Sequence, residues 1–391
     1  MHCSIPSELT IRHRAPSLVF RRIPLKSMPQ LSAFTPYNSV TGGVLLGTAT
    51  AGMLLLNGRV LGISGTVKGL LHHAPDWSWR SAFLAGLVGM GPVMAHLLPA
   101  AFQTFPASFT VGRAAASGVL VGLGVAMGNG CTSGHGICGN ARVSPRSLAF
   151  TLVFMAAGAA TALLAGSASA LGLASTPPPL APLAGGEGRL AASALATAAV
   201  TLACLGWAGR GKAAGSKAST STKHVLDVAS SGVLGALFAV GLAVSRMTLP
   251  AKVVAFLSVG TPSWDPSLAL VMGSALAIAM PAYHLVKQGA ATATRSPSPA
   301  PALVAAIAKA PVLATKYSLP TATRVDAQLL LGGVLFGVGW GLSGMCPGPA
   351  LVNGLVGALS PGQWHMPVFL MAMGLGMEVE PWATKLLVGK Q

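Results

Sequence analysis

The chain has 391 residues, of which 52% are hydrophobic and only 8% are charged, and its formal net charge is +17. A soluble domain carries about 25% charged residues, so this composition argues against a soluble enzyme, a disordered protein and a nucleic-acid-binding protein. Cytoplasmic loops of membrane proteins are enriched in Lys and Arg, so the positive charge instead fits a membrane protein.

The N-terminal tail, residues 1–36, is basic and contains five prolines. An Arg-rich, acid-poor segment is typical of an organelle transit peptide, whereas a basic cytoplasmic tail is the simpler interpretation. A multi-pass protein of the plasma membrane is therefore favoured, with an organelle membrane as the alternative. The charged residues of the tail are Glu8, Arg12, Arg14, Arg21, Arg22 and Lys26.

Long apolar stretches follow the tail. A membrane-spanning helix needs about 20 predominantly apolar residues, so the sequence predicts an all-α polytopic membrane protein. Shorter apolar pieces at 60–71, 250–259 and 348–359 cannot cross a bilayer. The expected spans lie at 39–57, 81–100, 116–129, 147–171, 190–208, 228–246, 266–286, 327–343 and 365–377.

Two basic segments divide these spans. Residues 210–224 and the Pro/Ala/Ser/Thr-rich residues 287–326 contain many more Lys and Arg than acids. The positive-inside rule predicts that both lie in the cytoplasm, on the same side as the N-terminal tail. The expected organisation is a tail (1–36), a first membrane half (37–209), a cytoplasmic linker (210–224) and a second membrane half (225–391) that contains the 287–326 loop.

Segments of the chain repeat, and three copies end in polar, helix-breaking sequences. Residues 118–131 match residues 333–346 at 6 of 14 positions, residues 235–247 match 333–345 at 7 of 13, and a fainter copy begins at Gly43. Irregular backbone at membrane depth persists only where protein or a water-filled cavity surrounds it, and many transporters build midplane sites from such broken helices. We expect pseudo-symmetric internal repeats with short half-helices and glycine-rich midplane loops.

The sequences GNGCTSGHGICG at 128–139 and GWGLSGMCPGPALV at 339–352 resemble the YeeE/YedE sulfur-transport family. The chain is similar to both halves of a two-gene version fused together. The resemblance implies a transporter, not an enzyme, that takes up thiosulfate or a related sulfur anion across the bilayer without a metal or other cofactor. It also implies that thiols contact the substrate. Cys131 and Cys346 match this pattern, but Gly62 stands where the best-known members have a further cysteine.

Other polar residues of the breaks complete the expected substrate site. Thr248 takes the place of Cys346 in the third copy, just as Arg246 takes the place of Gly344. Their neighbours either contact the anion or satisfy backbone groups of the broken helices. These residues are Asn129, Ser133, His135 and Ser343, together with Cys138, for which packing and pore lining both stay open.

Other functions remain as alternatives. The protein could be a membrane thiol carrier that transfers persulfide sulfur through Cys131 and Cys346, an exporter of sulfide or sulfite, or a subunit that partners a soluble sulfur-transfer protein. A metal site at Cys131, His135 and Cys138 is disfavoured, because no Cys-x-x-Cys pair is present.

Overall fold

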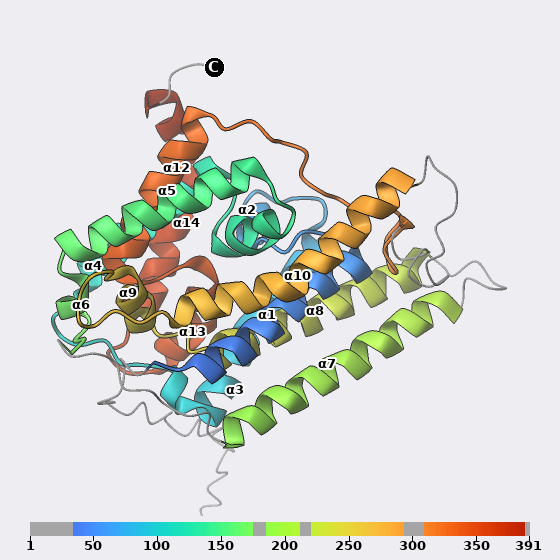
Figure 1. The fold of residues 1–391 in the computed structure, drawn as a ribbon, viewed down its shortest axis with the longest axis horizontal. Coiled ribbons are helices and arrows are strands. Elements are labelled where there is room, and N and C mark those ends of the chain that lie inside the picture. Colours follow the sequence, from blue (N-terminus) through green and yellow to red (C-terminus); the bar gives the residue numbers. More distant parts are fainter. Residues whose placement is uncertain (1–33, 175–184, 212–219, 293–308, 388–391) are drawn as a thin grey trace, which may run out of the picture.

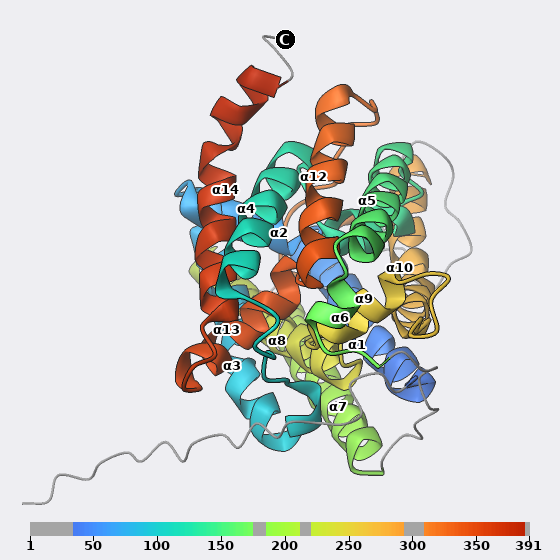
Figure 2. The same ribbon diagram turned by 90° about the vertical axis from the view of Figure 1, so that its left-hand side faces the viewer.

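The structure is a computed structural model that describes residues 34–174, 185–211, 220–292 and 309–387. These residues form a bundle of α-helices (Figures 1 and 2), which confirms the expected fold class. Within the described ranges, β-type pairing is limited to isolated bridges such as that between Arg59 and Ser318. In this part of the chain, four helices are long and apolar enough to cross a membrane, or up to six if each of two bent helix pairs counts as one span.

The chain contains four copies of one unit, in which a long helix, a break, a short helix and another helix follow in order. The three short apolar pieces expected at 60–71, 250–259 and 348–359 contain the short helices of three of these units. Three further helices of the described residues lie outside the repeats, namely η1 (Pro99–Ala101), α6 (Ser167–Ala170) and α7 (Gly185–Gly211). The repeats contain α1 (Pro36–Asn57), α2 (Ile63–Leu71) and α3 (Trp77–Leu97); α4 (Val111–Gly128), η2 (Thr132–Gly139) and α5 (Pro145–Leu164); α8 (Thr220–Val244), α9 (Pro250–Leu257) and α10 (Ser267–Thr292); and α12 (Ala327–Ser343), α13 (Pro347–Leu359) and α14 (His365–Leu387).

Each break begins with a residue in the left-handed backbone conformation. The φ angles are 70° at Gly58, 56° at Asn129, 58° at Arg246 and 67° at Gly344. This conformation suits glycine and is tolerated by asparagine, but it costs an ordinary residue such as arginine about 1–2 kcal/mol. The shared backbone geometry shows that the four breaks are structurally equivalent, and it confirms that Arg246 corresponds to Gly344.

The repeats pair in two lobes that do not follow the order of the chain. Helix α1 packs against α8 and α10, and α3 packs against α8. In the same pattern α4 packs against α12 and α14, and α5 packs against α12. One lobe therefore combines the first and third repeats, and the other combines the second and fourth. Helix α7 packs on α8 and α1 of the first lobe.

Glycines allow the backbones of the paired helices to approach closely. A Cβ on Gly124 of α4 would lie 2.3 Å from the backbone N of Phe336, and a Cβ on Gly332 of α12 would lie 2.6 Å from the backbone N of Gly128. Lipid provides little hydrophobic driving force between helices, so close packing of small residues stabilises the bundle instead. This contact explains why the repeats are so rich in glycine.

Helices α1 and α8 run antiparallel, so the third and fourth repeats are inverted relative to the first and second. At one end, Asn38 of α1 donates to Glu187 Oε2 of α7 over 2.7 Å. At the other end, Asn57 Nδ2 donates to Asp227 Oδ1 of α8 over 2.7 Å. Because α7 crosses the bundle between the second and third repeats, it reverses the direction of the later ones.

Residues 309–326, which we call the strap, lie at the end of the bundle where α1 finishes. The backbone N–H of Ser318 donates to Gly58 O over 2.7 Å. The start of α1 therefore lies at the opposite end from the strap and from the start of α8. This corrects the expectation that the N-terminal tail, the 210–224 linker and the 287–326 loop share one side. The tail itself and residues 212–219 and 293–308 lie outside the described residues.

Candidate functional site

The four short helices lie where the two lobes meet. Each one packs against the last helix of a repeat in the other lobe: α2 on α14, η2 on α10, α9 on α5 and α13 on α3. The starts of α2, η2 and α13, together with Val253 and Phe256 of α9, line a cavity with a volume of about 420 Å³, which we call the central cavity. Phe238, Met247, Met272 and Trp340 contribute to a wall that is predominantly apolar and contains no charged side chain. From the short helices, the lining residues are Ile63, Thr132, Ser133, Ile137, Val253, Phe256, Cys346, Gly348 and Pro349.

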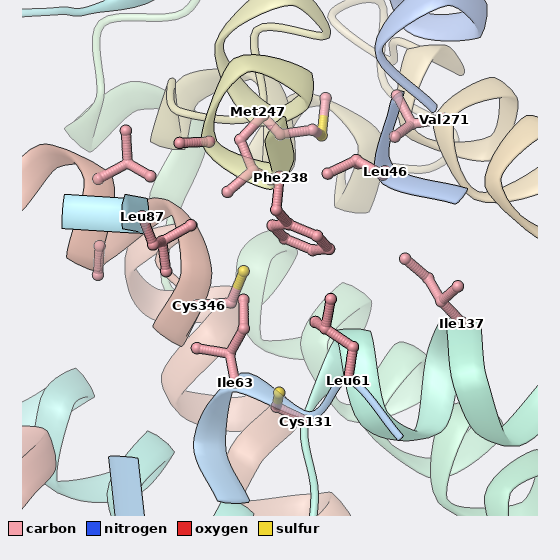
Figure 3. Packing of buried hydrophobic residues seen from close by; sticks show 14 of the residues in the cluster. Leu46, Leu61, Ile63, Leu87, Cys131, Ile137, Phe238, Met247, Val271 and Cys346 are labelled. Atoms are coloured by element: carbon pink, nitrogen blue, oxygen red, sulfur yellow. The ribbon is translucent and has the colours of Figure 1, made fainter. Parts of the chain in front are cut away.

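Cys346 precedes the first turn of α13 and lines the central cavity. Its side chain lies near Phe238 (Figure 3). Thr132 of η2 lines the same cavity, so residues of two different repeats lie together beside Cys346.

Cys131 occupies the same position at the start of η2 that Cys346 occupies at the start of α13. Its Sγ lies 3.2 Å from Ser133 Oγ, which accepts a hydrogen bond from the backbone N of Ile63 over 3.2 Å. Figure 3 shows the two cysteines near Ile63, and Thr132 and Ser133, which follow Cys131, line the same cavity as Cys346. The expected meeting of the two cysteine-bearing breaks is therefore present in the fold.

Gly62 takes the corresponding position at the start of α2. A Cβ at Gly62 would meet only the Cα of Gly134, at 3.8 Å. The first repeat thus has space for a side chain at the place where the second and fourth have a thiol.

Thr248 is directed away from the central cavity. Its hydroxyl donates to the backbone O of Ala101, and it is fully buried. The third break, from Arg246 to the start of α9, is one residue longer than the fourth, from Gly344 to the start of α13. Leu249 therefore stands immediately before α9. This extra residue places Thr248 one position before the place that Cys346 holds.

The other expected residues divide between the cavities and the backbone. Ser343 Oγ donates to Gly339 O over 2.9 Å and accepts from the backbone N of Met345 over 3.2 Å, so it caps the broken helix. Cys138 Sγ donates to Leu61 O over 3.1 Å and lines neither cavity.

His135 bridges two segments of its own repeat. Its Nδ1 lies 3.0 Å from Ser147 Oγ and its Nε2 lies 3.0 Å from Gly128 O. His135 therefore bonds the backbone, which is one of the two expected interpretations. It also lines a second cavity. Within the described part of the chain, no group of three or more His, Cys, Asp or Glu side chains could hold a metal ion.

A second cavity of about 420 Å³, which we call the vestibule, lies toward the strap end of the bundle. Asn129 and Gly130 line the vestibule, whereas Thr132 and Ser133 line the central cavity, so Cys131 lies in the partition between them. The remaining lining residues are mostly polar and were missed from the sequence. They include Arg59, Ser64, Asp76, Trp79, Arg80, Arg142, Arg146, Ser147 and Ser318.

Asp76 is the acidic residue among those lining the vestibule. Burial raises the pKa of Asp76, but hydrogen bonds from Arg80 and Trp79 outweigh burial, so the pKa is lowered from its ordinary value. Asp76 is therefore ionised at neutral pH and offsets one of the four arginine charges that line the vestibule.

Comparisons with known proteins point to transporters. The sequence profile of a family described as "Family of unknown function (DUF6691)" matches residues 224–385. A protein of Xylella fastidiosa (strain Temecula1) named "Probable transporter" is 37% identical over 143 residues, which cover 37% of this chain and 80% of the relative. A second protein of that strain with the same name is 45% identical over 127 residues, 32% of this chain and 93% of the relative. No solved structure matches the chain.

Proposed function

The chain belongs to the family of these probable transporters of Xylella fastidiosa, and from this premise we propose that it takes up thiosulfate or a related sulfur anion through the central cavity. The observation that carries the proposal is the convergence of two inverted, cysteine-bearing breaks on one cavity between the lobes. The likeness of residues 128–139 and 339–352 to the YeeE/YedE family supports a sulfur-containing substrate.

The chemistry of the central cavity suits a soft anion that must bind and then leave. The N-termini of short helices present backbone N–H groups and partial positive charge to an anion. The thiols of Cys131 and Cys346 are weak donors that can meet a terminal sulfur atom, and Met247 and Met272 add polarizable sulfur. Because no charged side chain lines the cavity, the anion is not held so tightly that it stops moving.

Trp340 supplies a hydrogen-bond donor to this apolar surrounding. It lines the central cavity, it is 2% exposed, and its indole Nε1 has no hydrogen-bond partner within the described ranges. A buried N–H without a partner is unfavourable, and an oxygen atom of a bound anion would satisfy it. Together with the hydroxyls of Thr132 and Ser133, Trp340 suits the sulfonate oxygens of thiosulfate.

The inverted repeats also suggest how access alternates. Transporters built from inverted repeats move one bundle against the other around a site at their interface. Here the short helices lie at that interface, and Cys131 lies between the central cavity and the vestibule. An anion that leaves Cys346 would therefore pass Cys131 before it reaches the strap end.

The alternative functions predict different chemistry. A thiol carrier would form a persulfide on Cys131 or Cys346, which requires a thiolate, but no basic side chain lines the central cavity to stabilise one. Transport of the intact anion therefore fits the site better. Recovery of chemically unchanged thiosulfate inside the compartment supports transport, whereas a persulfide found by mass spectrometry supports the carrier.

Uptake of radiolabelled thiosulfate by cells that lack their own thiosulfate transporter tests the proposal. We expect Cys346→Ala to abolish uptake while the protein still inserts into the membrane. Cys138→Ala is the matched control, since Cys138 is also a buried thiol but lines neither cavity. Wild-type uptake by the Cys346→Ala variant, or equal loss in both variants, would contradict the proposed role of the central cavity.

A further inference from the structure

The vestibule is strongly basic although most of its charge is paired. Four arginines line it, and Arg142 is the one without a carboxylate partner among the described residues. The Nε of Arg142 donates to Cys138 O over 3.3 Å, and its Nη1 donates to Pro320 O over 3.0 Å. The ion pairs of the other three are Arg59–Asp227 at 2.6 Å, Arg80–Asp76 at 2.8 Å and Arg146–Asp326 at 2.8 Å.

The two carbonyl bonds orient the guanidinium of Arg142 without neutralising it. Both acceptors are uncharged, and no hydrogen bond from Nη2 of Arg142 to a described residue is found. An arginine held in this way presents a fixed fork of N–H donors, the geometry that matches planar or tetrahedral oxyanions.

Ser64 provides an independent indication of a ligand. It is the second residue of α2, it is 2% exposed, and it lines the vestibule. Its hydroxyl oxygen has no hydrogen-bond partner among the residues that the structure describes. Buried hydroxyl groups are nearly always hydrogen-bonded, so a lone one beside a cavity calls for a ligand or water as its partner.

The first turn of α2 adds to the positive potential at this place. The residue before it is Gly62, which has no side chain to cap the turn, although the N–H of Ile63 already donates to Ser133 Oγ. The first N–H groups of a helix have no acceptor inside the helix and attract an anion. Gly62, Ser64, Gly65 and Thr66 all border the vestibule.

We propose that the vestibule is a second anion-binding site, which holds the sulfonate-type oxygens of a sulfur oxyanion through Arg142, the Ser64 hydroxyl and the first turn of α2. The proposal rests on the proposed function and divides the recognition between two cavities. The Cys346 thiol of the central cavity and the Cys131 thiol of the partition contact the soft sulfur atom, whereas the vestibule has no thiol in its lining and contacts only the hard oxygens. The vestibule should therefore also bind sulfate, which has no terminal sulfur to offer a thiol.

Calorimetric titration of the full chain in lipid nanodiscs tests this site separately from transport. The background carries Cys131→Ala and Cys346→Ala, so that the thiol contacts of the central cavity and of the partition are both removed. We expect this background to bind both thiosulfate and sulfate. Adding Arg142→Gln should weaken the binding of both anions about tenfold or more, because a charge-assisted hydrogen bond is lost.

Two further variants separate the site from general effects. Ser64→Ala removes a hydroxyl that has no partner, so it should fold as well as the background and still weaken sulfate binding severalfold. Arg324→Gln removes the same charge from an exposed position at the same end of the bundle, and it should leave the affinity within about twofold.

The outcomes distinguish the two proposals. Equal affinity in the background and in both the Arg142→Gln and Ser64→Ala variants would overturn the vestibule site, even if wild-type protein transports thiosulfate. An equal loss in Arg142→Gln and Arg324→Gln would also overturn it, because the effect would then be one of overall charge. If wild-type protein takes up no thiosulfate but Arg142 and Ser64 still determine sulfate binding, the proposed function fails and the anion site stands.

Discussion

A thiol introduced at Gly62 tests whether the short-helix N-termini form one substrate path. Gly62 has φ −125° and ψ 104°, an extended conformation that any residue adopts, and a Cβ there would lie 3.8 Å from the Cα of Gly134. Replacing glycine where the backbone permits it stabilises a protein by about 0.4–1 kcal/mol through the unfolded state. Losing glycine as the capping residue costs a similar amount. We therefore expect Gly62→Cys to change the free energy of unfolding by less than about 1 kcal/mol.

The added thiol would lie in the partition between the central cavity and the vestibule, where Cys131 also lies. It completes the set of three thiols that the best-known YeeE/YedE members have at these positions, so we expect the initial rate of thiosulfate uptake to rise. Gly62→Ala fills the same space without sulfur and is the control. Equal uptake rates in the Gly62→Cys and Gly62→Ala variants would refute the reasoning. A loss of folded protein in both would refute the account of the space around Gly62.

Three further changes test other parts of the account. Cysteines placed in the strap, residues 309–326, should react only with reagents on the cytoplasmic side, and a cysteine at Pro36 should react only with reagents on the opposite side. Reaction of both from the same side would contradict the inverted arrangement. Lys252→Met should lower the free energy of unfolding by about 3–5 kcal/mol, because it leaves Asp265, its fully buried partner at 2.6 Å, without an ion pair. Thermal unfolding in detergent measures this loss, and an unchanged midpoint would contradict it. Thr248→Val should lower stability, since a buried carbonyl loses its donor, but leave the KM for thiosulfate unchanged, and a raised KM would restore Thr248 to the substrate site.

Three of the four breaks could be found from the sequence because local chemistry determines them. Asn129 and Gly344 are residue types that adopt the left-handed conformation, and the repeat alignment added Arg246, which does not favour it, whereas the break at Gly58 was not predicted. The same alignment failed by one residue at Thr248, because the third break is longer than the fourth. Composition alone does not reveal such an insertion.

The grouping of the repeats and the vestibule depend on contacts between distant segments. Nothing local indicates that the first repeat pairs with the third, or that α7 inverts the later repeats by adding one crossing. The arginines of the vestibule are spread from Arg59 to Arg146, and their charge is equally well explained by cytoplasmic loops. Ser64 has no sequence signal at all, because its hydroxyl is notable only once its burial is known.

The central claim is that an intact sulfur anion crosses the membrane by way of two thiols. The most direct measurement is the initial rate of thiosulfate uptake into liposomes that contain purified protein, with the internal product identified. We predict that wild-type protein and Cys138→Ala accumulate chemically unchanged thiosulfate, whereas the Cys131→Ala, Cys346→Ala double variant shows no more uptake than liposomes without protein. Uptake by the double variant at the wild-type rate would contradict the claim.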